Sequence, residues 1–155
     1  MKFRILILAL GLMTVATMAQ KVANFSGSWQ FNPEKSKNVG MMGQMKMVLT
    51  ITQTDSSLDI TTRSTYQGRD DDSKLHYDLT GKPVTNELPM GDPSETVSKW
   101  EGARLVTTWT SESAVAGGPK VVRTETRSLS PDGKTMTVEL VRGSNPSLVM
   151  VFEKK

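Results

Sequence analysis

The stretch TITQTDSSLDITT, residues 50–62, contains two runs in which apolar and polar side chains alternate, separated by Asp55 and Ser56. Alternation with a period of two is typical of a strand that has one buried face and one solvated face. A two-residue loop at Asp55 and Ser56 would pair Ile51 with Ile60, so that the apolar faces of both strands coincide. The stretch therefore predicts an antiparallel hairpin with one face in a core.

The same pattern continues along the chain after residue 20. Short runs rich in β-branched and aromatic residues are broken by Gly, Pro, Asn and Asp, and none has the spacing of an amphipathic helix. Ten strands are predicted, at 25–31, 46–54, 57–66, 74–80, 83–88, 94–100, 103–112, 120–129, 134–142 and 147–154. Closure of such a meander removes its exposed edges. We expect an all-β fold, a single antiparallel up-and-down β-barrel of 8–10 strands over residues 20–155.

The lengths of the connections distinguish the two ends of this barrel, because alternate connections of a meander lie at the same end. Tight turns are predicted at 55–56, 101–102 and 131–133, and longer connections at 32–45, 67–73, 89–93 and 113–119. The tight turns share one end and the longer connections share the other. This arrangement predicts a closed base and an open mouth, which is the geometry of a pocket.

Residues 1–19, MKFRILILALGLMTVATMA, have the organisation of a secretory signal peptide, with basic Lys2 and Arg4, an apolar run and a small residue, Ala19, before the cut. Removing them brings the formal net charge of +3 close to neutral, which argues against nucleic acid as a partner. The chain has no cysteine for a lipid anchor or a disulfide, and its apolar run is too short to span a bilayer. We expect a monomer without a membrane anchor, exported to the periplasm or the medium after cleavage near Ala19.

Gly27 and Trp29 open the first predicted strand, within NFSGSWQFNPEKSKN at 24–38. This Gly-x-Trp pattern resembles the start of lipocalins and the wider calycin group. The segments FSGSWQFNPEKS and LSPDGKTMTVE are similar to those of small exported lipocalin-like proteins of bacteria. The resemblance implies that Gly27 and Trp29 are structural residues at the barrel base, and that Arg142 or Lys154 caps Trp29.

The hairpin at Pro131-Asp132-Gly133 decides what faces the interior near the C-terminus. If Gly133 forms a bulge, Ser128 faces Met136, and Arg123, Glu125 and Arg127 form a charged ladder on the outer face. The interior is then apolar with scattered hydroxyls and no charge. The residues expected to contact a ligand are Tyr66, Trp100, Thr107, Trp109, Thr124, Thr126, Met47 and Thr62.

A small neutral or amphipathic hydrophobic molecule fits such a wall, because a buried carboxylate would need an interior Arg or Lys. The methionines near Gly40 and Gly43 could form a lid over the mouth, or simply cover apolar surface in a mobile loop. His76 is the single histidine and is expected to point outward, and Asp70, Asp71 and Asp72 are expected at a solvated loop tip. No catalytic residue, metal site or cofactor is predicted.

Two other functions remain open at this point. The barrel could be an envelope interaction or inhibitor module with a filled interior, which a core without a cavity would favour. It could also be an enzyme, which needs a buried acid or base. An inward-facing Glu125, Arg123 or His76 would favour the enzyme, which is otherwise the last of the three.

Overall fold

The computed structural model describes residues 22–87, 91 and 93–155. The predicted signal peptide and most of the predicted connection at 89–93 lie outside the described residues. Ten strands and two short 3-10 helices follow one another: β1 Gly27–Phe31, η1 Pro33–Lys35, η2 Gly40–Gln44, β2 Lys46–Gln53, β3 Ser57–Tyr66, β4 Arg69–Asp78, β5 Val84–Glu87, β6 Pro93–Glu101, β7 Arg104–Ser111, β8 Val121–Leu129, β9 Thr135–Arg142 and β10 Leu148–Lys154.

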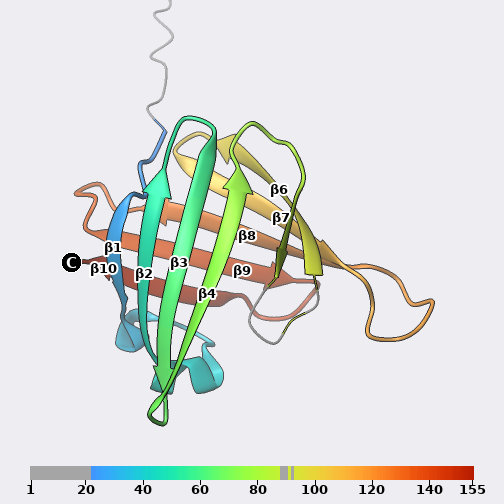
Figure 1. The fold of residues 1–155 in the computed structure, drawn as a ribbon, viewed down its shortest axis with the longest axis horizontal. Coiled ribbons are helices and arrows are strands. Elements are labelled where there is room, and N and C mark those ends of the chain that lie inside the picture. The colour runs from blue at the N-terminus through green and yellow to red at the C-terminus, as the bar shows by residue number, and fades with distance from the viewer. Residues whose placement is uncertain (1–21, 88–90, 92) are drawn as a thin grey trace, which may run out of the picture.

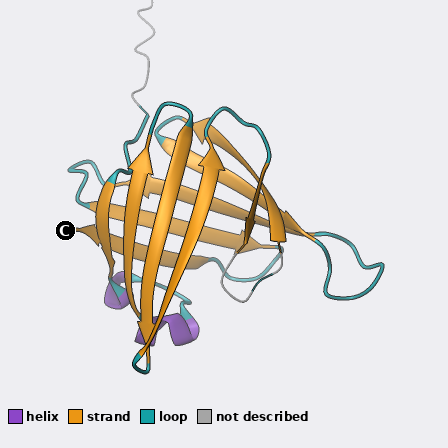
Figure 2. Cartoon of the chain, in the orientation of Figure 1, coloured by secondary structure: helices purple, strands orange, loops and turns teal. Residues whose placement is uncertain are grey.

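All ten strands form one antiparallel sheet in the order β4-β3-β2-β1-β10-β9-β8-β7-β6-β5. The sheet curls into a nearly closed barrel with β4 and β5 as its two edges (Figure 1). Figure 2 shows that helix is confined to the connection between β1 and β2, at one end of the barrel. The predicted all-β, up-and-down barrel is therefore confirmed.

The β2–β3 hairpin has the predicted register, with Ile51 opposite Ile60. The turn between β6 and β7 lies one residue further along than predicted, at 102–103, and Trp100 pairs with Leu105. This changes the pairing by two residues and leaves every side chain on its predicted face, because the side-chain period of a strand is two.

The predicted loop at 67–73 is a tight turn followed by strand. Gln67 and Gly68 both have positive φ, 49° and 77°, which is the backbone of a type I′ turn between paired Tyr66 and Arg69. Strand β4 therefore begins at Arg69, and the three consecutive aspartates lie within it, exposed, instead of at a loop tip.

The predicted β8–β9 register is wrong by one residue. Leu129 pairs with Met136, and Arg127 pairs with Val138. Ser130 N donates to the Thr135 carbonyl at 2.8 Å, so the loop between them has four residues, 131–134, and no bulge. An even loop in place of an odd one moves β8 to the opposite face. In β8 the side chains of Arg123, Glu125 and Arg127 therefore point inward, and those of Thr124 and Thr126 point outward.

Trp29 lies toward the end of the barrel that carries the β2–β3, β6–β7 and β8–β9 turns, whereas the tight β3–β4 turn lies at the other end, so the predicted separation of tight turns from long connections is wrong there. Its ring is fully buried and its Nε1 donates to the Phe25 carbonyl at 2.8 Å. Phe25, also fully buried, stacks on Trp100 with ring centroids 6.0 Å apart. Lys154 Nζ lies 5.3 Å from the centroid of the Trp29 ring, so Lys154 is the basic cap. Aromatic side chains close the base.

Candidate ligand-binding site

A charged group lies inside the barrel on β8. The side chains of Arg127 and Glu125 are only 5% and 11% exposed, and Arg127 Nη2 donates to Glu125 Oε1 at 2.7 Å. The Tyr77 hydroxyl, from β4 across the interior, donates to Glu125 Oε2 at 3.5 Å. Arg127 Nη1 also lies 3.6 Å from the Met136 sulfur. Alternation along β8 puts Arg127 and Glu125 on one face, where they must pair because neither is solvated.

Tyr77 is fixed as a neutral donor in this group. Burial raises the pKa of Tyr77 well above its usual range, the charge of Glu125 raises it further, and Arg127 opposes the shift. The Tyr77 ring also meets Trp109 edge-on, with centroids 5.9 Å apart. The phenol therefore keeps its proton and supports the Glu125 carboxylate.

Three buried N–H groups have no hydrogen-bond partner among the described residues: Trp109 Nε1, Arg123 Nε and Arg127 Nε. Trp109 and Arg123 are directly opposite each other in the β7–β8 register. A buried donor left unpaired costs about 1–3 kcal/mol, so native proteins rarely keep several together without an acceptor nearby. This part of the interior is therefore suited to a group that accepts hydrogen bonds.

Exposure of the inward side chains increases from the base toward the opposite end of the barrel. Near the base, Leu58, Leu105 and Met136 are at most 2% exposed. Toward the other end Ser64, Ser94 and Ser111 are buried. Other inward side chains there are half-buried: Met47, Thr62, Tyr66, Ser73, Arg123, Leu140, Leu148 and Met150. The barrel is thus filled near the base and more accessible beyond the charged group.

The structure brings some of the predicted contact residues to this region. Thr107 and Trp109 are buried beside the charged group, with Thr107 opposite Glu125 in the β7–β8 register. Met47, Thr62 and Tyr66 line the more accessible half. Trp100 lies instead at the base, on Phe25.

Thr124 and Thr126 were expected inside and lie on the outer face, because the β8–β9 hairpin lacks the expected bulge. The same register error hid Arg123, Glu125 and Arg127 from the sequence analysis. The signal that could have found them is the four-residue loop Pro131-Asp132-Gly133-Lys134, read without a bulge.

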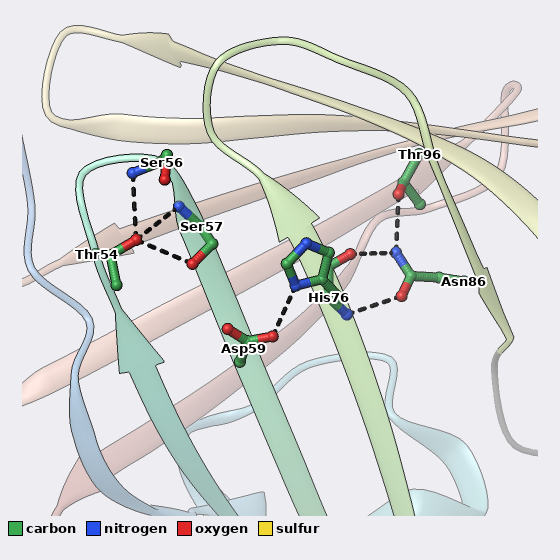
Figure 3. Close-up of polar contacts among 7 residues, drawn as sticks. All are labelled: Thr54, Ser56, Ser57, Asp59, His76, Asn86 and Thr96. Atoms are coloured by element: carbon green, nitrogen blue, oxygen red, sulfur yellow. Dashed lines mark hydrogen bonds and ion pairs between the residues drawn. The ribbon is translucent and has the colours of Figure 1, made fainter.

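His76 is half-exposed and its Nδ1 lies 2.7 Å from Asp59 Oδ1 on the neighbouring strand (Figure 3). Among the described residues, no group of three or more His, Cys, Asp or Glu is placed to hold a metal ion. Those residues also contain no helix long and apolar enough to cross a membrane. In the β1–β2 connection Met41 is 75% exposed, whereas Val39 packs against the core.

A groove of about 400 Å³ runs along the outer surface where β4 approaches β5. Its lining includes Asp59, His76 and Glu87, together with Ile60, Leu75 and Asn86, whose side chains belong to the inward faces of their strands. The groove thus lies over the place where the two edges of the sheet approach each other.

Known structures share this architecture, a calycin-type β-barrel. The chain superposes on Echinococcus granulosus fatty-acid-binding protein 1 with a TM-score of 0.64 and 14% identity, over 84% of this chain and 96% of that one. The superposition on Caenorhabditis elegans lipid binding protein 8 has a TM-score of 0.66 and 14% sequence identity, and it covers 84% of this chain and 95% of that one. The superposition on the Schistosoma mansoni fatty acid binding protein in complex with arachidonic acid has a TM-score of 0.63 and 16% sequence identity, and it covers 84% of this chain and 96% of that one. No family model and no curated protein matches the sequence. At these identities the likeness shows a common fold.

Proposed function

We propose that the protein binds one amphipathic small molecule inside the barrel and holds an anionic head group against Trp109, Arg123 and Arg127. The observation that carries this proposal is the set of three buried N–H groups that have no partner among the described residues, on the inward faces of β7 and β8. A carboxylate or a similar anion would accept these hydrogen bonds and offset their desolvation.

The charges favour an anion over the neutral ligand that the sequence favoured. Glu125 balances Arg127, which leaves the charge of Arg123 without an ion-pair partner among the described residues. Arg142, opposite Arg123 on β9, adds a second positive charge toward the rim. A buried carboxylate needs such a partner, and the interior now supplies it.

The tail of the ligand would lie along the half-buried apolar side chains Met47, Leu140, Leu148 and Met150. A wall of thioethers and leucines adapts to flexible chains and stabilises them through burial of apolar surface. Solved structures of this fold include proteins named for fatty-acid binding, which supports a chain with an acidic head as the ligand class.

The enzyme alternative is weaker although Glu125 does face inward. A general base needs a free lone pair directed at a substrate, and this carboxylate is occupied by Arg127 and Tyr77. The interaction module with a filled barrel is supported by the packed base. It remains the outcome if no ligand binds.

The test compares palmitate with its methyl ester, using displacement of a fluorescent fatty-acid analogue and native mass spectrometry. We expect the acid to bind about tenfold more tightly than the ester, and Arg123→Gln to remove that preference. Arg104→Gln, an exposed position on β7, is the matched control and should keep it. If the wild-type protein binds neither compound, or binds both equally, the anionic head-group site is wrong.

We also propose that the protein is exported and monomeric. The N-terminal sequence supports export, because residues 1–19 have the organisation of a signal peptide. Intact mass and N-terminal sequencing of the protein from fractionated host cells should give a chain that begins after Ala19. Recovery of the full-length chain from the cytosol would contradict export, and light scattering checks the oligomeric state.

A further inference from the structure

The barrel has one seam, between β4 and β5, where the two edges of the sheet meet. Among the described residues, the side chain of Asn86 forms the hydrogen bonds that join them there. His76 N donates to Asn86 Oδ1 at 2.8 Å, and Asn86 Nδ2 donates to the His76 carbonyl at 2.7 Å (Figure 3). The side-chain amide of Asn86 therefore takes the place of a paired residue in an antiparallel ladder, where one residue exchanges both bonds with its partner.

Both N–H groups of this amide donate a hydrogen bond, and its oxygen accepts one. Asn86 Nδ2 donates its second hydrogen bond to Thr96 Oγ1 at 2.8 Å, and Thr96 Oγ1 donates to the Val84 carbonyl at 2.9 Å. Asn86 is 5% exposed and Thr96 is 2% exposed. Thr96 therefore orients Asn86 toward β4 from behind, and together they close the seam.

The outer groove lies directly on this closure. Ile60 and Leu75, which line the groove, are also inward-facing residues of β3 and β4 that contact the core. The polar side of the groove is formed by Asp59, His76 and Glu87. Asn86, whose amide joins β4 and β5, also lines this groove.

Immediately behind the closure is the candidate head-group site. Tyr77 follows His76 in β4, and Trp109 lies opposite Thr96 in the β6–β7 register. The rings of Tyr77 and Trp109 are in edge-on contact, so both partners of Asn86 adjoin this aromatic pair. At the base, by contrast, the side chains of Phe25 and Trp29 are fully buried.

We propose that the β4–β5 seam is the entrance through which the ligand reaches the barrel interior, and that Asn86 is the latch that holds it shut. This rests on the proposed function. Opening the seam breaks the hydrogen bonds of one side-chain amide and leaves every backbone ladder of the sheet intact. The rest of the barrel wall opens only by breaking such a ladder.

The chain offers a matched comparison at the opposite candidate entrance. Asn38 Nδ2 donates to the Ser147 carbonyl at 2.7 Å and so ties the β1–β2 connection to the β9–β10 connection at the mouth. Asn86→Ala and Asn38→Ala each remove one side-chain amide that joins two segments. Thr96→Val is a milder seam variant that keeps Asn86 and loses only the hydroxyl behind it.

The experiment is stopped-flow association and dissociation of a fluorescent fatty-acid analogue with the wild-type protein and the three variants. Loss of the latch should raise both rates about tenfold in Asn86→Ala with little change in Kd, and more modestly in Thr96→Val. Asn38→Ala should leave both rates within about twofold of the wild type. Faster exchange in Asn38→Ala, with unchanged rates in both seam variants, would place the entrance at the mouth and overturn the proposal.

A second readout does not depend on the ligand and separates the two proposals. Asn86→Ala should increase acrylamide quenching of tryptophan fluorescence and amide hydrogen exchange in β4 and β5 more than Asn38→Ala does. If the wild-type protein binds no analogue, the proposed function fails and this readout alone decides whether the seam opens to small molecules. Equal quenching and exchange in the two variants would rule that out.

Discussion

Arg127 donates a hydrogen bond to Glu125, two residues earlier on the same strand, across 2.7 Å inside the barrel. Both side chains are almost completely buried, so each charge depends on the other for compensation. Because side chains alternate along β8, the two residues share a face. The register turns that face inward, so the two charges are buried together and must pair.

Glu125→Leu should destabilise the protein by about 3–5 kcal/mol, because it leaves the Arg127 guanidinium buried without its counter-charge. The double variant Glu125→Leu/Arg127→Met removes both charges and should recover most of that loss. Urea unfolding followed by tryptophan fluorescence measures both free energies. A single variant as stable as the wild type would contradict burial of the pair.

The buried phenol of Tyr77 should make the protein lose stability at high pH. Because its folded-state pKa is raised, the unfolded chain releases this proton above about pH 10 while the folded chain keeps it. The folded state then binds more protons, so the free energy of unfolding falls as the pH rises.

Tyr77→Phe should remove that fall, and Tyr66→Phe, which keeps Tyr77, should retain it. Urea unfolding between pH 8 and pH 11 checks this. Equal pH profiles for the wild type and Tyr77→Phe would show that another group is responsible.

Gly27→Ala should destabilise the base by about 1–3 kcal/mol. The φ of Gly27 is +128°, a region that side chains other than glycine avoid, and a Cβ there would lie 3.1 Å from Lys154 Cε. Gly43→Ala is the control, since its Cβ would meet Val39 Cγ2 at an ordinary 3.4 Å. Thermal unfolding should show a lower Tm for Gly27→Ala than for the wild type, and an unchanged Tm for Gly43→Ala. Equal Tm values for the two variants would contradict a special role of Gly27.

Gln67→Asn should stabilise the protein by about 0.5 kcal/mol, because Asn-Gly suits the positive φ angles of a type I′ turn better than Gln-Gly does. The φ of Gln67 is 49° and that of Gly68 is 77°. Gln44→Asn, at an exposed position of η2, is the control and should leave the free energy of unfolding unchanged. Destabilisation by Gln67→Asn would argue against a tight turn between β3 and β4.

The sequence predicted strands well and predicted the face of a strand only where the turn could be counted. Asp55 and Ser56 form the expected two-residue loop, so Ile51 and Ile60 meet as predicted. The Pro131-Asp132-Gly133 stretch fits both a three-residue loop with a bulge and a four-residue loop, and the two place opposite faces of β8 inside. Composition could not decide between them, because Arg and Glu are commonly exposed and the alternating threonines suit either face.

The candidate site was hidden by the same ambiguity. Trp109 and Thr107 were identified because β7 alternates clearly, but their charged neighbours on β8 were assigned to solvent. Tyr77 was not among the predicted site residues, because its partner Glu125 was expected on the outer face. A side-chain latch such as Asn86 leaves no periodic signal, since its effect depends on one residue across the seam.

The β1–β10 ladder changes how the barrel is divided. Trp29 pairs with Lys154, so the first and last strands lie side by side in the middle of the sheet, and the seam falls between two strands that are consecutive in the chain. In covalent terms the protein is two meanders, β1–β4 and β5–β10, linked by residues 79–83. Cutting the chain there would leave the strand ladders intact, and two separately made fragments should assemble through the β1–β10 ladder and the side chains that meet inside the barrel, such as Tyr77 with Glu125.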